Sequence, residues 1–447
     1  MTAAVALVPR AATDVLFHSP GQAFTVADLL AEAGRVADAL PDSSYVVNLC
    51  HDRWRFTTVL AAAALRGQVC LLSSDASPGR LSALAGRFGS LCSVADDPAL
   101  ESPLRHLCLG AMTSGRASSG APNLELPAER LAAIVFTSGT SGEPVDCPKR
   151  WGELAARSAA AAHRFGLLSG AAPTSIVGTV PPRHMYGFET TILLPLHTAA
   201  GTWCGPSFYP SDIQSALVSV PAPRLLVTTP LQLRALLRSK TSLPPLTRII
   251  SATAPLDAAT ALAAERLWDT EVWEIFGATE LGSIASRRTA ADPDWTTYAG
   301  VSVAPDGTGG ARVSAPLAAR RTLTDLVDVL DPTHFRLIGR ADDVVKLGGR
   351  RASLAALTCI LTGIAGVTDG VFVAPDDLDE RPTARLQAFA VASARSADEI
   401  LAELRGRIDT VFLPRRVVLV DALPRNETSK LPRHALSAVG VPDAGQD

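Results

Sequence analysis

Two kinds of hydrophobic pattern alternate from Tyr45 onward, and they predict the first elements. Short apolar runs have the length and composition of buried strands, whereas the segments between them place apolar residues on one helical face. The predicted strands are 45–50, 68–74 and 90–96, and the predicted helices are 56–65 and 78–88. Gly67 and Gly89 stand where those helices should end. This βαβαβ order predicts a parallel sheet covered by helices.

The alternation resumes after a less periodic stretch at 99–129 and continues to about residue 290. Further strands are expected at 131–136, 174–180, 225–229, 248–252 and 271–276, with helices between them and a helical apolar run at 188–196. From Asp292 to Thr324 short strands and glycine-rich turns predict a small β subdomain. The last part follows a β, α, β, α, β order. A polar turn at Arg340–Asp343 divides the chain into an N-terminal domain, 1–340, and a C-terminal domain, 341–447.

One strand ends in a loop that is rich in hydroxyl groups and glycine. The strand runs from Leu131 to Phe136, and after the loop and a polar turn a helix is expected from Trp151. The loop residues are Thr137, Ser138, Gly139, Thr140, Ser141 and Gly142. Hydroxyls, backbone N–H groups and the nearby Lys149 suit a nucleotide polyphosphate. The spacing is not that of the common G-x-x-x-x-G-K-[ST] loop. By itself the pattern also fits a solvated turn.

Composition and charge narrow the classes of function. The chain has 447 residues, which predicts two or three domains, and it is 47% hydrophobic and 19% charged, which argues against disorder. Lys plus Arg number 41 and Asp plus Glu 44, a net charge of −3 without a basic block. A nucleic-acid partner is therefore not expected.

Cysteine usage and the N-terminal segment indicate a compartment. The 7 cysteines are an odd number and form no C-x-x-C pair, so neither a disulfide framework nor a cysteine zinc site is expected. The N-terminal segment lacks a basic region before its apolar run, and no uninterrupted apolar stretch is long enough for a membrane span. We expect a cytoplasmic protein.

Three later stretches form a series of motifs together with the hydroxyl-rich loop. They are FGATELG at 276–282, the run from Thr324-Asp325 to GRADDVVKLGGRR at 339–351, and PRNETSKLPR at 424–433. In order and spacing, the four stretches resemble the core motifs of adenylate-forming enzymes, the superfamily of acyl- and aryl-CoA synthetases, nonribosomal adenylation domains and luciferase. The resemblance covers the chain from about Tyr45 onward. The lengthened turn before Lys149 is similar to compact ligases of aryl polyene and xanthomonadin pigment pathways.

This resemblance implies a fold and a reaction in two halves. The fold has a large N-terminal domain of parallel-type sheets covered by helices, a small β subdomain and a small, mobile α+β C-terminal lid. In the first half-reaction a carboxylate attacks the α-phosphorus of ATP, with Mg²⁺, to give an acyl-adenylate and pyrophosphate. In the second, a phosphopantetheine thiol of CoA or of an acyl carrier protein displaces AMP. The acid implied is aromatic, such as a hydroxybenzoate.

The resemblance also assigns roles in nucleotide binding. The loop from Thr137 to Gly142 would wrap the β- and γ-phosphates, with Lys149 as a displaced counter-charge. The Thr279 hydroxyl would bind the α-phosphate, and Glu280 would hold Mg²⁺. Simpler interpretations of these features remain: a solvated lysine ahead of a helix for Lys149, and a helix cap for the Thr-Glu pair.

Other residues would bind the nucleoside and the acid. Phe276, where relatives carry tyrosine, would stack on adenine, and Asp325 and Arg340 would contact the ribose. His184 would lie beside the acyl carboxylate, although a histidine in a turn is also an ordinary surface residue. The walls of the acid pocket would be Ala252, Thr253, Ala254, Ile275, Gly277 and Phe188.

The C-terminal domain would supply different residues to each half-reaction. Lys430 would reach the α-phosphate and the substrate carboxylate during adenylation. Asp342 falls at the hinge position, and Lys346 and Gly349 would face the thiol channel after the lid rotates.

Alternative functions remain open at this stage. The acid could be a medium- or long-chain fatty acid rather than an aromatic acid. The chain departs from the motifs at Val145, Thr324 and Ser429, which would suit a binding or regulatory protein that has lost turnover. The joint presence of Thr279, Glu280, Asp325 and Lys430 favours an enzyme. The loop lacks the Lys-[ST] pair that ends the common phosphate-binding motif, so a simple P-loop NTPase is not expected.

Overall fold

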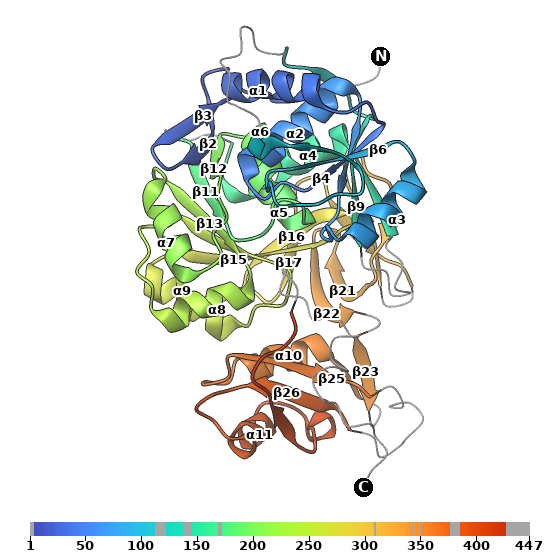
Figure 1. The fold of residues 1–447 in the computed structure, drawn as a ribbon. Coiled ribbons are helices and arrows are strands. Elements are labelled where there is room, and N and C mark those ends of the chain that lie inside the picture. Colours follow the sequence, from blue (N-terminus) through green and yellow to red (C-terminus); the bar gives the residue numbers. More distant parts are fainter. Residues whose placement is uncertain are drawn as a thin grey trace.

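Two β-sheets make up most of the chain, and Figure 1 shows a separate group of C-terminal elements, in orange and red, below β21 and β22. The structure is a computed structural model. It describes residues 4–111, 122–137, 145–168, 172–307, 310–340, 343–347, 350–375 and 385–425. None of the helices in these ranges has both the length and the apolar character needed to cross a bilayer.

The smaller of the two sheets contains the predicted βαβαβ unit. Its order in the described chain is β10-β9-β5-β4-β6-β7. The strands are β4 (Tyr45–Asn48), β5 (Val69–Leu72), β6 (Leu91–Ala95), β7 (Arg105–Cys108), β9 (Leu131–Thr137) and β10 (Val145–Arg150). Strands β4, β5 and β6 pair in parallel, as expected. Helices α2 (Arg53–Arg66) and α3 (Pro78–Phe88) connect them, and each ends at a glycine with positive φ, 75° at Gly67 and 69° at Gly89.

Strand β10 corrects one prediction. The residues before Trp151 were expected to form a polar turn, but Val145–Arg150 pairs antiparallel with β9. Side chains alternate along it, with Cys147 and Lys149 buried and Val145 exposed. One of the two inward positions is a lysine, so the segment does not show the apolar alternation that identifies a half-buried strand.

The larger sheet has the order β21-β22-β17-β16-β15-β14-β13-β11-β12-β2-β3 in the described chain. Its strands are β2 (Val15–Ser19), β3 (Gln22–Thr25), β11 (Thr174–Gly178), β12 (Ala200–Trp203), β13 (Arg224–Thr228), β14 (Arg248–Ser251), β15 (Glu271–Ala278), β16 (Gly282–Arg288), β17 (Trp295–Thr297), β21 (Asp325–Asp331) and β22 (His334–Arg340). From β2 to β15 neighbouring strands of this order are parallel, whereas the pairs from β15 to β21 are antiparallel. The sheet is therefore mixed, with a parallel centre.

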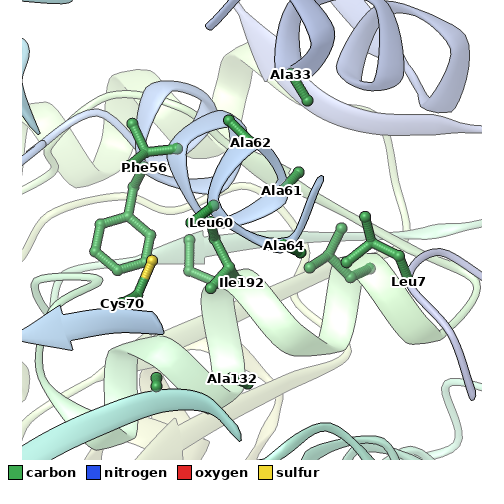
Figure 2. Close-up of a cluster of buried hydrophobic side chains, with 14 of the residues drawn as sticks. Leu7, Ala33, Phe56, Leu60, Ala61, Ala62, Ala64, Cys70, Ala132 and Ile192 are labelled. Atoms are coloured by element: carbon green, nitrogen blue, oxygen red, sulfur yellow. The ribbon is translucent and has the colours of Figure 1, made fainter. Parts of the chain in front are cut away.

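Helices pack around the two sheets. They are α1 (Val26–Ala39), α4 (Trp151–Phe165), α5 (Met185–Gly187), α6 (Leu194–His197), α7 (Pro210–Ser219), α8 (Pro230–Ser239) and α9 (Ala258–Trp268), with a π-helical turn (Phe188–Leu193) between α5 and α6 and a short 3₁₀ turn (Leu109–Ala111). Figure 2 shows α2 between Ala33 of α1 and Ile192 of the π-helical turn, with Ala61 and Ala62 on its surface. Alanines let neighbouring backbones approach closely, so α2 joins both sheets through one hydrophobic cluster.

Smaller sheets complete the described chain. Strands β1 (Ala4–Ala6) and β8 (Glu125–Pro127) pair with each other, and β18 (Ser302–Pro305), β19 (Ala311–Ser314) and β20 (Arg321–Thr322) form the predicted small β subdomain. The C-terminal elements are β23 (Val344–Leu347), β24 (Arg350–Ser353), α10 (Leu354–Thr362), β25 (Asp369–Val373), β26 (Gln387–Val391), α11 (Ala397–Arg405), a 3₁₀ turn (Thr410–Phe412) and β27 (Val417–Leu419). They enclose a hydrophobic cluster of their own, from Val345 to Val417. Arg238 of α8 donates a hydrogen bond to the carbonyl oxygen of Thr368, at 3.1 Å, and so joins these elements to the larger sheet.

The half-buried His197 at the end of α6 generates a prediction about acid stability. Its Nδ1 lies 3.1 Å from Ser158 Oγ, and burial lowers the pKa of His197 from 6.5 to about 4. Between these two values the unfolded chain binds a proton that the folded chain does not bind. The free energy of unfolding should therefore fall as pH is lowered from 6.5 to 4, by about 3 kcal/mol from this group.

Denaturant unfolding across this pH range is the measurement. His197→Gln should remove this part of the pH dependence, whereas His163→Gln, at an exposed position of α4, should keep it. Equal pH profiles for the two variants would contradict the assignment to His197.

Candidate active site

A tight hairpin places Thr279 and Glu280 at the end of β15. The turn at 279–281 joins β15 to β16, and both side chains are half-buried. A Cβ at Gly277 would overlap the carbonyl oxygen of Gly282 and lie 2.8 Å from Ser283 Cα, so the hairpin closes only with glycine there. Gly277, predicted as a pocket wall, thus also shapes the turn.

The ribose-binding residues predicted from the motifs face each other on neighbouring strands. Asp325 and Arg340 are Cα partners in the β21–β22 pair, and Asp325 is 7% exposed. Of Arg340 only the backbone is described. These strands follow β17 and β16 in the larger sheet, so one sheet carries both this pair and the Thr279–Glu280 turn.

Phe276 packs inside the protein against aromatic residues of β17 and β22. Its ring is 8% exposed, and its centroid lies 5.4 Å from those of both Trp295 and Phe335. Much of the ring surface is therefore in contact with the core. Its stacking on adenine remains a prediction.

The predicted acid-binding loop follows β14. Ala252 is buried and Ala254 is exposed, while Thr253 adopts a φ of 82°. Such a conformation is unusual for a β-branched residue and stores strain. The Thr253 hydroxyl oxygen is buried, and within the described residues it has no hydrogen-bond partner.

Two side chains connect this loop to its surroundings. Tyr186 donates a hydrogen bond from its hydroxyl to the carbonyl oxygen of Ile250, at 3.0 Å, which ties α5 to the end of β14. His184 is half-buried and directly precedes α5. Its position beside the substrate carboxylate remains a prediction. Glu274 accepts a hydrogen bond from the Leu256 backbone N–H at 2.8 Å.

Glu274 was not predicted as a site residue. It is 3% exposed and forms an ion pair with Arg287 at 2.7 Å. An acidic residue at an inward position of an apolar strand was the available signal, because a buried carboxylate requires partners.

Lys149 extends from the smaller sheet to the turn on the larger sheet. Its side chain is 0% exposed, and its Nζ donates a hydrogen bond to the carbonyl oxygen of Glu280 at 3.0 Å. Arg157 of α4 and Glu189 of the π-helical turn, which were not predicted as site residues, are also buried and contact the segment after Glu280. Charged residues inside apolar helical runs were the signal for both.

Several predicted residues lie outside the described part of the chain. They are Ser138, Gly139, Thr140, Ser141 and Gly142 of the phosphate loop, Asp342 at the hinge, Gly349 of the thiol channel, and Lys430. Thr137 ends β9 and Lys346 lies in β23, but only their backbones are described.

Comparison with known proteins identifies the chain. The AMP-binding enzyme family matches residues 5–308. The chain belongs to this family. It is an ATP-using, AMP-forming acid–thiol ligase, and its homologues include two proteins named 4-coumarate–CoA ligase.

These homologues and a solved structure cover most of the chain. The 4-coumarate–CoA ligase of Rhodobacter capsulatus is 30% identical over 314 residues, which is 68% of this chain and 75% of that protein. The protein of the same name from Halorhodospira halophila is 29% identical over 319 residues, 68% of this chain and 76% of that one. The anthranilate CoA ligase AuaEII, solved with anthranoyl-AMP, has the same fold, with a TM-score of 0.80 at 16% identity over 96% of this chain and 94% of that one.

The strained backbone of Thr253 generates a testable prediction. Thr253→Gly should have a free energy of unfolding about 1 kcal/mol higher than that of Thr253→Ala, because glycine adopts a positive φ without a Cβ clash. Thr253→Ala is the matched control, since it removes the hydroxyl and keeps the Cβ. Urea denaturation measures both, and an alanine variant as stable as the glycine variant would contradict the strain at this position.

Proposed function

We propose that this ligase adenylates an aromatic carboxylic acid and passes the acyl group to a phosphopantetheine thiol of CoA or of a carrier protein. The observation that carries the proposal is the single sheet that holds both the Thr279–Glu280 turn and the Asp325–Arg340 pair. A nucleotide whose ribose binds at the pair would extend its phosphates towards the turn. The two relatives named as 4-coumarate–CoA ligases support an aromatic acid.

The first half-reaction needs charge neutralisation and in-line attack. A substrate carboxylate oxygen forms a bond to the α-phosphorus while the bond to the pyrophosphate oxygen breaks. Asp325 accepts hydrogen bonds from the ribose hydroxyls and so fixes the nucleoside. The Thr279 hydroxyl donates to an α-phosphate oxygen, the loop from Thr137 to Gly142 surrounds the pyrophosphate, and Lys430 adds positive charge as the acyl-adenylate forms.

The residues at the turn fit a magnesium ion. Glu280 is half-buried, and its carboxylate has no hydrogen-bond or ion-pair partner in the described ranges. Those ranges also contain no group of three His, Cys, Asp or Glu residues that could hold a metal. One carboxylate together with phosphate and water oxygens is the ligand set in which proteins commonly hold Mg²⁺. When bound, the ion neutralises phosphate charge.

The second half-reaction uses the C-terminal domain differently. The thiol loses its proton to solvent, its sulfur forms a bond to the acyl carbon, and the bond between the acyl carbon and the phosphate oxygen breaks, so that AMP leaves with the electron pair. In this proposal the domain turns about Asp342 and presents Lys346 and Gly349 to the thiol in place of Lys430. His184 lies beside the acyl carboxylate in the acid pocket and can hydrogen-bond it.

An acid-dependent pyrophosphate exchange assay tests the function. We expect the purified protein, with ATP and Mg²⁺, to transfer label from pyrophosphate into ATP when benzoates or cinnamates are supplied. Pyrophosphate exchange with fatty acids but with no aromatic acid would contradict the proposed class of substrate. The absence of exchange with every benzoate and cinnamate in the panel would contradict the proposed adenylation of an aromatic acid.

The role of Glu280 generates a separate prediction. Glu280→Gln keeps the size of the side chain and removes its charge, so exchange at limiting Mg²⁺ should fall about 100-fold. Glu271→Gln, a half-exposed acid at the opposite end of β15, serves as the control and should exchange normally. Near-normal exchange by Glu280→Gln would show that the metal is held elsewhere.

A further inference from the structure

The turn that carries Thr279 and Glu280 rests on three charged side chains from distant parts of the chain. Lys149, Arg157 and Glu189 are 0%, 5% and 7% exposed. They belong to β10, α4 and the π-helical turn, respectively. The proposed reaction steps use none of them, so their burial behind the turn requires another explanation.

The two cations hold successive carbonyl groups of the turn. Lys149 Nζ donates to the carbonyl oxygen of Glu280 at 3.0 Å, and Arg157 Nη2 donates to that of Leu281 at 3.2 Å. Hydrogen bonds from a charged donor are stronger than neutral ones. The peptide groups on the C-terminal side of Glu280 therefore have fixed orientations.

Glu189 holds the backbone where the turn enters β16. Both of its carboxylate oxygens accept from the Ser283 N–H, at 3.2 and 3.0 Å. Gly282, between the two sets of contacts, has a φ of 75°, and a Cβ there would overlap the Glu189 carboxylate. Glycine thus allows the carboxylate to approach the backbone closely.

The charges also depend on one another. Burial raises the pKa of Glu189, while Arg157, Lys149 and the Ser283 N–H oppose that rise. Lys149 Nζ lies 3.7 Å from the Glu153 carboxylate as well. A buried ion cluster is often no more stabilising than apolar residues of similar volume. This cluster instead fixes the position of the backbone that it contacts.

A ligand-binding role does not fit the space available. The cavity beside the cluster, lined in part by Arg157, Glu189 and Ser283, has a volume of about 10 Å³. That is room for about one water molecule. The hydrogen bonds of the three side chains at the turn are instead made to the protein backbone.

We propose that Lys149, Arg157 and Glu189 form a buried clamp that positions the 279–283 segment for nucleotide and metal binding. The proposal rests on the proposed function, in which Thr279 and Glu280 meet the phosphates and Mg²⁺. Because Lys149 fixes the carbonyl of Glu280, it limits the backbone angles of that residue and hence the direction of its carboxylate. Lys149 is a positioning residue that acts through Glu280, without touching phosphate.

Lys149→Met tests the clamp, since it removes the ammonium group and keeps a long apolar side chain. The matched control is Arg150→Met, because Arg150 is the next residue of β10 and its side chain is 49% exposed. Hydrogen–deuterium exchange followed by mass spectrometry reports on the turn without turnover. Amide exchange at 279–283 should rise about tenfold in Lys149→Met and stay unchanged in Arg150→Met.

Kinetics separate positioning from direct phosphate binding. With the clamp, Lys149→Met should lower the kcat of pyrophosphate exchange about 10- to 100-fold and raise the Mg²⁺ concentration needed for half-maximal rate, with the KM for ATP changed less than about threefold. A KM for ATP that rises as much as kcat falls would overturn the clamp in favour of phosphate contact. Unchanged amide exchange at 279–283 would also overturn it.

A second variant covers the case in which Lys149→Met does not fold. Glu189→Gln keeps one oxygen acceptor for the Ser283 N–H and removes the charge, and the same changes in amide exchange and kcat are expected. If the unaltered protein catalyses no pyrophosphate exchange with any of the acids supplied, the proposed function fails. The clamp is still decided by the amide exchange, because that response needs no turnover.

Discussion

A buried ammonium group is the constraint on which the arrangement around the active site depends. An uncompensated charge in a protein interior costs several kcal/mol, so Lys149 can be buried only where acceptors surround it. The place where the two sheets meet supplies the Glu280 carbonyl as acceptor and the Glu153 carboxylate as ion-pair partner, and the charge of Glu189 also acts on Lys149. The contact between the sheets is therefore polar behind the turn and apolar along α2 (Figure 2). The apolar contact tolerates small shifts, whereas the polar contact fixes a geometry.

Much of the fold was predictable because apolar residues recur at different spacings in its strands and in its helices. The βαβαβ unit, the helices α7 to α9 and the small β subdomain each follow from local pattern, and glycines mark the ends of α2 and α3. Strand β10 did not, since Lys149 occupies an inward position and Pro148 interrupts the strand residues. The β15–β16 and β21–β22 pairs are local hairpins, but β22 also pairs with β17, which joins Trp295 to Phe335. Local periodicity does not encode that longer-range pairing.

Parts of the local geometry of the candidate active site were predictable from short motifs. The spacing of the motifs brought Asp325 opposite Arg340 and put Thr279 and Glu280 in one turn. It gave no indication that Thr253 would adopt a positive φ, because the backbone angle at that position is set by how the loop packs rather than by its composition. Arg157 and Glu189 lie outside the motifs, 124 and 94 positions from the turn residues that they contact, and only the folded chain brings their side chains to the turn.

The hydrogen bond from Lys149 to Glu280 joins residues that are 131 positions apart. Contacts of such long range form only after the loop-closure entropy of the intervening chain has been overcome. An intermediate with one sheet formed, or with both sheets formed but not yet joined, would contain every motif and lack a fixed turn. The turn that carries Thr279 and Glu280 would then take its final shape only when the two sheets meet, so the ability to form an acyl-adenylate would depend on the completed fold.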